Sequence, residues 1–148
     1  MFSDYESYEK ECDRIEKENE SLLDLFEKDL RAAGLKERTI RNHLYNADFY
    51  INSFLMRIGP CSAAEGTDYV DSFLGDFFIR KCMWSTPQSV KTTAASIKKF
   101  YKSMMEHGIT DKESYSFLCL TIKENLDWWQ ENCRIYNEPD ESDSFFFF

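Results

Sequence analysis

The sequence has few glycines and prolines and no long hydrophobic run. Its 148 residues include only 5 Gly and 3 Pro, while hydrophobic residues make up 43% of the chain. This balance is typical of helices joined by short turns. No apolar stretch reaches the roughly 20 residues that a membrane span needs, and the acidic start lacks the basic and apolar regions of a signal peptide. We therefore expect one all-α domain in the cytoplasm, without membrane association.

The patterns of a disulfide framework, a metal site and an enzyme are also missing. The cysteines are Cys12, Cys61, Cys82, Cys119 and Cys133. They are odd in number, are widely spaced and never form a C-x-x-C pair, and neither His43 nor His107 lies near a cysteine cluster. We expect reduced, mostly buried thiols and no metal or cofactor. No carboxylate pair, Ser/Cys–His set or phosphate-binding loop is recognisable, so we expect no enzymatic activity.

Charge is present in quantity but is unevenly distributed. The formal net charge is -9, and the two ends of the chain, residues 1–21 and 137–148, contribute -5 and -4. The central stretch 22–110 has a net charge of +2. The acidic total therefore does not exclude an anionic partner for the central part of the chain.

The clearest helix lies between Ser85 and Gly108. Ser85 or Thr86 can cap the first turn, and Pro87 fits the first helical position. Gly108 provides a left-handed stop. Residues at steps of three and four predict a buried stripe, consisting of Val90, Ala94, Ile97, Tyr101 and Met104. Another face is basic and carries Lys91, Lys98, Lys99 and Lys102. This face is the first candidate for a binding surface.

Two further helices are predicted before this one. The range 35–58 has the strongest apolar stripe, formed by Ile40, Leu44, Ala47, Ile51, Phe54 and Ile58. Its first turns carry Lys36, Arg38 and Arg41, with Asn42 beside them. The helix macrodipole opposes bases at this end, so something other than helix stability favours them there, although Glu37 weakens the argument. After a loop at 59–67, Thr67 is expected to cap a helix over 68–82, in which Gly75 lets a neighbouring helix approach.

The acidic stretch 5–20 can be read in two ways. Ser21 and Asp24 resemble a capping box, so we expect a break or kink near Ser21 and a short helix from there to Gly34. Residues 1–20 are then a solvated helix face or a frayed arm. The alternative is one long first helix, whose stripe comprises Tyr8, Cys12, Ile15, Asn19, Leu22 and Phe26.

The last helix is expected to begin at a Thr110–Glu113 capping box and to end near Asn137, because Pro139 forbids continuation. It contains Trp128 and Trp129, which cannot both face the same core. One of them is therefore expected to contact another subunit, the N-terminal arm or the tail.

The tail 138–148 is acidic and ends in four phenylalanines. These aromatic residues, including Phe145 and Phe146, either tuck into this domain or a partner's groove, or form an unstructured end. A further possibility is that the acidic part covers the basic helices as a nucleic-acid mimic.

The order of these features resembles a known DNA-binding module. A short helix ends in Ala32-Ala33-Gly34-Leu35, and Thr39-Ile40 opens a long helix that carries Phe49-x-x-x-x-Phe54-Leu55. A loop and a shorter helix follow, and Ser85-Thr86 leads to Ile97-Lys98-Lys99-Phe100-Tyr101 and Gly108. Over 22–108, more than half of the chain, this order is similar to the N-terminal core-binding domain of tyrosine recombinases and phage integrases, a SAM-like four-helix module.

The resemblance implies binding to double-stranded DNA through the second and fourth helices of the module. These would be the helices that carry Lys36, Arg38, Arg41 and Asn42, and Lys91, Thr92, Lys98, Lys99 and Lys102. The family's catalytic domain has no counterpart in this chain, and neither histidine forms the family's His-x-x-Arg. Strand cleavage is therefore not expected.

Two functions follow as alternatives. The first is a non-catalytic DNA-binding module, accessory or regulatory to a mobile element. The second is a helical interaction protein that keeps the fold without binding DNA, and that holds a protein partner or a second copy through its C-terminal helix, with Trp128, Trp129, Phe145 and Phe146 as candidate contacts. We expect an arm or helical extension at 1–20, a core-binding-like domain at 21–110, a packed helix at 111–137 and a tail at 138–148.

Overall fold

The computed structural model describes residues 4–138, which form five helical segments and no strand in that range. Three segments are single α-helices: α1 (Asp4–Ala32), α6 (Pro87–Glu106) and α7 (Lys112–Asn137). One composite segment consists of α2 (Glu37–Asp48), the π-helix η1 (Phe49–Phe54) and α3 (Leu55–Arg57). The other consists of the 3-10 helix η2 (Ala63–Tyr69), α4 (Val70–Ser72), the π-helix η3 (Phe73–Phe77) and α5 (Phe78–Lys81). The predicted all-α bundle with a long C-terminal helix is confirmed.

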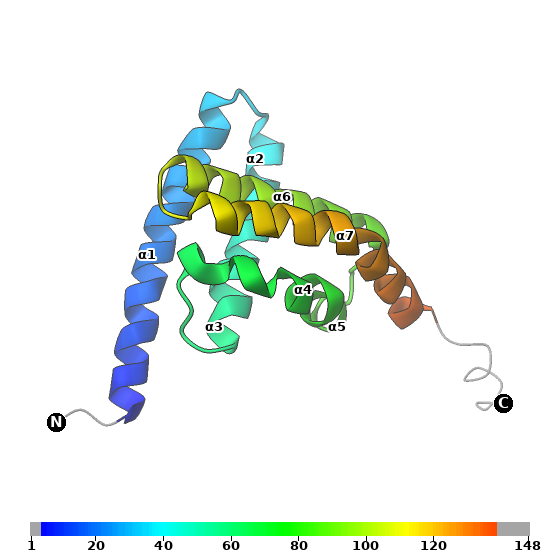
Figure 1. Ribbon diagram of the computed structural model, residues 1–148, viewed down its shortest axis with the longest axis horizontal. Helices are drawn as coiled ribbons and strands as arrows, with labels where there is room; N and C mark the ends of the chain where they lie inside the picture. Colours follow the sequence, from blue (N-terminus) through cyan, green and yellow to red (C-terminus); the bar gives the residue numbers. More distant parts are fainter. Residues whose placement is uncertain (1–3, 139–148) are drawn as a thin grey trace.

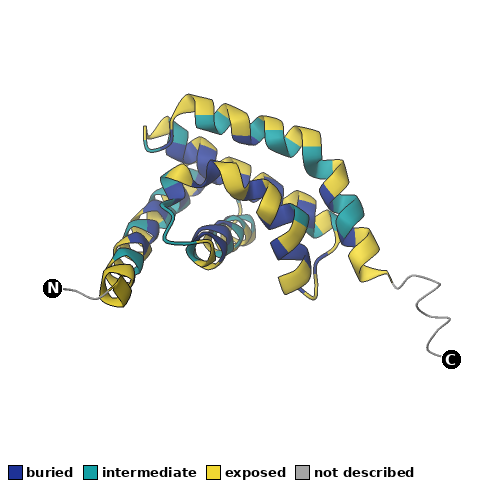
Figure 2. Ribbon diagram, turned by 60° about the horizontal axis from the view of Figure 1, so that its bottom comes forward, coloured by how far each residue is buried: buried dark blue, intermediate teal, exposed yellow. Residues whose placement is uncertain are grey.

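Helix α6 occupies the middle of the bundle. It packs against α2 on one side and α7 on another, and it also contacts α1. Figure 1 shows α6 and α7 side by side across the molecule, whereas α1 stands at one end and its first turns extend past the other helices. The buried faces of the helices turn towards one another, and the outer face of α7 stays largely exposed (Figure 2). No helix among the described residues is long and apolar enough to cross a membrane.

The sequence signals at the ends of α6 are confirmed. The Thr86 hydroxyl oxygen accepts a hydrogen bond from the Ser89 N–H at 3.0 Å, and the Ser89 hydroxyl oxygen accepts one from the Thr86 N–H at 2.7 Å. Pro87 occupies the first turn, and Gly108 has a φ of 75° just beyond the helix. The predicted stripe is buried at all its positions, which are Val90, Ala94, Ile97, Tyr101 and Met104.

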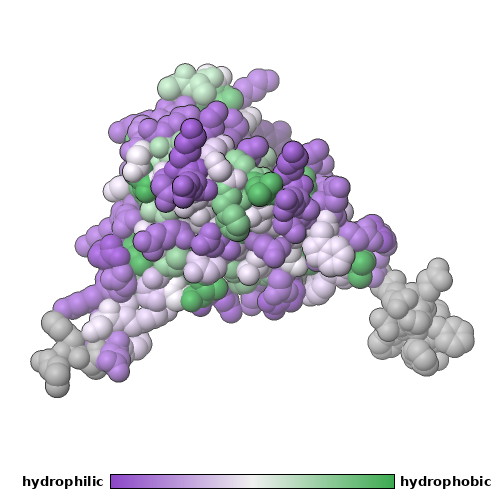
Figure 3. All heavy atoms as spheres, viewed as in Figure 1, coloured by the Kyte–Doolittle hydropathy of each residue, from purple (hydrophilic) through white to green (hydrophobic). Residues whose placement is uncertain are grey.

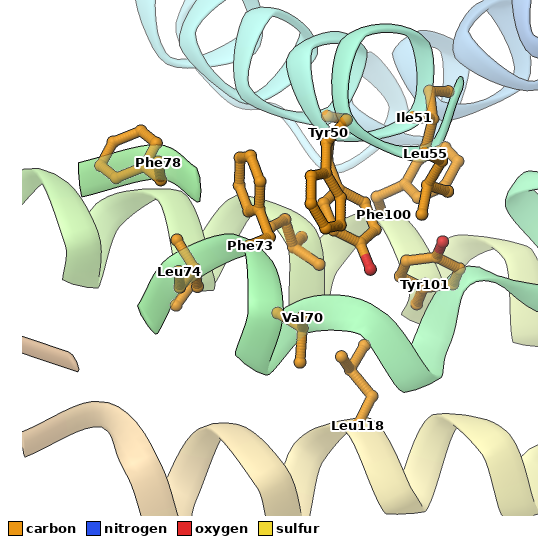
Figure 4. Packing of buried hydrophobic residues seen from close by; sticks show 14 of the residues in the cluster. Tyr50, Ile51, Leu55, Val70, Phe73, Leu74, Phe78, Phe100, Tyr101 and Leu118 are labelled. Carbon is orange, nitrogen blue, oxygen red and sulfur yellow. The ribbon is translucent and has the colours of Figure 1, made fainter. Parts of the chain in front are cut away.

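The aromatic core lies between the two composite segments and α6. The ring centroid of Phe54 in η1 lies 5.1 Å from the centroids of both Phe73 and Phe77 in η3. Tyr50 lies 5.0 Å from Phe73 with the rings edge to face. Figure 4 shows Tyr50 and Phe73 side by side from two helical segments, with Tyr101 of α6 nearby. Both π-helical turns thus occur where large rings meet, a feature that periodicity in the sequence did not predict.

The expected break near Ser21 is wrong, and the alternative of one long helix is correct. Ser21 sits inside α1, where its hydroxyl donates to the Lys17 carbonyl instead of capping a new helix. Tertiary contact maintains the helix, because the buried Asn19 side chain donates to the Ile51 carbonyl at 3.4 Å and to the Asn52 side-chain oxygen at 2.7 Å. The expected boundary at residue 20 therefore falls within a continuous element.

Two predicted helix caps are also corrected. Thr67 is buried inside η2 and caps nothing, because the helical segment already begins at Ala63. At the start of α7, the carboxylate of Asp111 accepts the Ser114 N–H at 2.7 Å. Thr110 is buried, and its hydroxyl donates to the Ala64 carbonyl at 3.1 Å. Thr110 therefore links the start of α7 to η2.

The predicted close approach at Gly75 is confirmed by the position of Trp129. A Cβ atom added at Gly75 would lie 3.0 Å from Cδ1 of the Trp129 indole. Trp129 is fully buried, and its ring N–H donates to the Asp71 carboxylate at 2.7 Å. This indole therefore connects α7 to the segment α4–η3.

All five cysteines are free thiols. Cys82 and Cys133 are buried, whereas the other three are only partly buried. No group of three or more potential metal ligands occurs within residues 4–138.

Candidate nucleic-acid interface

The structure places the two predicted basic sets on neighbouring helices. The side chains from α6 are Lys91, Lys98, Lys99 and Lys102, and those at the start of α2 are Lys36, Arg38 and Arg41. All seven residues are exposed, and none forms an ion pair with a carboxylate in the described part of the chain. Helix α2 packs directly on α6. The seven residues therefore come from two adjacent helices, and we refer to them together as the basic face.

Four other arginines differ from those of the basic face, because they form ion pairs with carboxylates. Arg14, Arg31, Arg80 and Arg134 each pair with nearby glutamates or aspartates. Arg31 is of particular interest because its guanidinium binds both oxygens of Glu37, at 2.6 and 2.9 Å. This pairing lowers the pKa of Glu37 and occupies the acid in the first turn of α2. The charge of Arg41 also lowers the pKa of Glu37, although Arg38 and Arg41 form no ion pair with a described carboxylate.

A groove of about 400 Å³ separates the exposed sides of α2 and α6. Its lining from α2 consists of Thr39, Asn42, His43, Tyr45 and Asn46, and its lining from α6 consists of Ser89, Thr92, Thr93, Ala95 and Ser96. Trp84 completes the wall. The predicted contacts Asn42 and Thr92 thus line the same groove. Asn42 offers amide donors there, whereas the Thr92 hydroxyl already donates to the Ser89 carbonyl at 3.1 Å.

A polar cluster forms one wall of the groove. Ser96 Oγ lies 2.8 Å from His43 Nδ1, accepts from the Asn46 amide at 3.0 Å, and donates its proton to the Thr92 carbonyl at 3.1 Å. Since the only hydroxyl proton of Ser96 is used there, Nδ1 of His43 donates to Ser96 and Nε2 remains an acceptor. A nucleophilic serine would instead give its proton to the histidine. The pair is therefore not arranged for hydrolysis.

His43 is held in its neutral form near pH 7. Partial burial lowers the pKa of its imidazole, and the nearby positive charge of Lys99 lowers it further. A neutral imidazole adds a hydrogen-bond acceptor to the groove without adding positive charge. The charge of this surface therefore comes from the lysines and arginines.

A second hollow of about 390 Å³ adjoins the groove, and Tyr45 and Trp84 line both. It also contains Arg57 and Lys81, of which Arg57 lies over the Phe77 ring at 5.5 Å from the centroid. Neither aromatic residue was predicted from the sequence as a site residue. Trp84 stands in a turn between two helices, and only its neighbours in space reveal its place in the wall of the α2–α6 groove.

The residues predicted to bind a protein partner differ in their exposure. Trp128 is 62% exposed on the outer face of α7, as required of a contact residue. The prediction that Trp129 contacts a partner is wrong, because its side chain is buried in the core and hydrogen-bonded to Asp71. Phe145 and Phe146 lie outside the described residues. Figure 3 shows the face on which α7 lies as mainly hydrophilic, with small hydrophobic areas separated from one another.

Comparisons with known proteins do not identify a family. No family model matches the chain, and neither curated proteins nor solved structures give a significant match. The resemblance to recombinase core-binding domains therefore stays a prediction. The geometry of the basic face carries the functional argument.

Proposed function

We propose that this chain is a non-catalytic DNA-binding module that holds DNA through the basic face on α2 and α6. The observation that carries the proposal is the set of seven exposed cations on the adjacent helices α2 and α6, none of which pairs with a described carboxylate. The predicted resemblance adds the context of a mobile element, in which the chain would be an accessory or regulatory factor.

The chemistry of the basic face suits phosphates better than base edges. Lysine and arginine side chains neutralise backbone phosphates, and amide groups such as that of Asn42 can donate to phosphate oxygens. Such contacts fix the position of a protein on DNA but do not read its sequence. We therefore expect affinity with little sequence preference.

The proposal predicts a steep dependence of DNA affinity on salt. Each phosphate that a basic side chain neutralises contributes about 0.9 to the magnitude of the slope of log K against log salt, so five to seven contacts give a slope of roughly -4.5 to -6.3. Fluorescence anisotropy with a labelled duplex between about 50 and 200 mM salt measures this slope. A slope near zero would contradict a phosphate-binding basic face.

A protein-interaction role is the second candidate, and the outer face of α7 favours it. Trp128 is exposed there together with Phe117, Leu120, Ile135 and Tyr136. Exposed aromatic residues frequently anchor protein interfaces. The net charge of -9 also opposes approach to DNA over long distances. Absence of any duplex binding at the lowest salt would favour this second function over the first.

A further inference from the structure

We propose that Tyr45 and Trp84 stack on unpaired bases, so that the preferred ligand is DNA with a single-stranded segment beside its duplex. This inference rests on the DNA-binding function proposed above. Both side chains are 56% exposed, and both line the α2–α6 groove and the adjoining hollow. Aromatic side chains beside a basic groove are the usual means of holding a single strand without reading its sequence. Bases inside a duplex cover one another's faces, so only an unpaired base can use these rings.

Trp84 is exposed but firmly anchored. It lies in a turn between Cys82 and Ser85, which are only 3% and 2% exposed. The Ser85 N–H donates to the Cys82 carbonyl at 2.9 Å, and the Asn137 side chain donates to the Ser85 carbonyl at 2.6 Å. The indole also packs edge to face against Phe78, with the centroids 5.8 Å apart. Because the ring is already held, stacking on a base costs little side-chain entropy.

The two hollows beside these rings have suitable size and polarity. Their volumes of about 400 and 390 Å³ fall within the roughly 300–1,000 Å³ that small ligands occupy in proteins. In the groove, Asn42 and Nε2 of His43 offer donors and an acceptor to a base edge. In the second hollow, Arg57 and Lys81 provide positive charge for the phosphates of the same strand. A strand passing Tyr45 and Trp84 therefore meets basic groups in both directions, because Lys99 lies near His43 on the groove side.

The test compares a blunt duplex with the same duplex carrying a single-stranded thymidine overhang, using anisotropy and the full chain. The overhang is expected to raise affinity about tenfold or more, since stacking on one aromatic side chain gives this order of gain. Trp84→Ala and Tyr45→Ala should each remove most of the gain and leave blunt-duplex affinity within about twofold. Trp84→Phe should retain most of it, because a phenyl ring still stacks.

Trp128→Ala is the matched control, because it removes an exposed tryptophan from α7, away from the groove, and it should retain the full gain. The proposal is overturned if the overhang adds no affinity, if the gain survives both Trp84→Ala and Tyr45→Ala, or if Trp128→Ala removes it equally. In these cases blunt-duplex binding still supports the function proposed above. Absence of binding to either probe would refute that function and this inference together.

Discussion

Replacement of the four α6 lysines by glutamine is expected to weaken duplex binding by about three powers of ten near 0.1 M salt. The variant changes Lys91, Lys98, Lys99 and Lys102. Each of these lysines is exposed and unpaired with described carboxylates, so each can neutralise one phosphate. Loss of four such contacts should also reduce the magnitude of the salt slope by about three to four. Anisotropy titrations at several salt concentrations measure both quantities.

A matched control separates a local contact from a general charge effect. It carries glutamine at Lys10, Lys17, Lys28 and Lys112, which are exposed residues on α1 and α7. Both variants lose the same number of positive charges, but the control leaves the basic face intact. We expect the control to keep nearly the wild-type slope. An equal loss of affinity in the two variants would show that binding depends on net charge and not on α6.

Replacement of Trp129 by alanine is expected to lower the free energy of unfolding by about 3–5 kcal/mol. The side chain is fully buried, and its ring lies against Gly75. Alanine would leave a cavity between α7 and η3 and would remove the hydrogen bond to Asp71. Urea denaturation followed by circular dichroism measures the change. A small loss would mean that α7 does not depend on this indole for its position.

The neighbouring residue provides the comparison within the same helix. Trp128 is 62% exposed, so Trp128→Ala should change the free energy of unfolding by no more than about 0.5 kcal/mol. Adjacent tryptophans would then differ severalfold in their effects. If Trp128→Ala were instead the more destabilising change, the assignment of the buried and exposed rings would be wrong.

Local signals in the sequence were sufficient for much of the fold. The limits of α6 follow from Thr86, Pro87 and Gly108, because caps and turn residues act through neighbours in the chain. The exposure of its lysines follows from helical periodicity alone. The residues of the basic face could therefore be predicted, but the packing of α2 on α6 could not be derived from these local signals.

Other features depend on contacts between distant residues. The continuity of α1 past Ser21 depends on Asn19 reaching Ile51, and the choice between Trp128 and Trp129 depends on the space beside Gly75. Likewise, Thr110 was the predicted cap of α7, but its hydroxyl bonds to the distant Ala64 carbonyl and Asp111 caps the helix instead. Periodicity within one segment contains no information about such contacts.

The hollows of the candidate site also depend on contacts between residues that are distant in the sequence. The sequence separates Tyr45 from Trp84 by a loop and a helical segment, and only the packing of these elements brings both rings to one surface. The short turn from Cys82 to Ser85 has no motif that marks it as a binding element. The charged half of the site was therefore predictable, and its aromatic half was not.

The central claim is that DNA lies on α2 and α6. The most direct test is an NMR titration with a duplex, in which changes in the backbone amide shifts are mapped onto the structure. The account predicts that the largest shifts occur along these two helices, around Asn42, Thr92 and Lys99, and that α7 near Trp128 changes little. Shifts concentrated around Trp128, with α2 and α6 unchanged, would contradict the basic face as the DNA-binding surface.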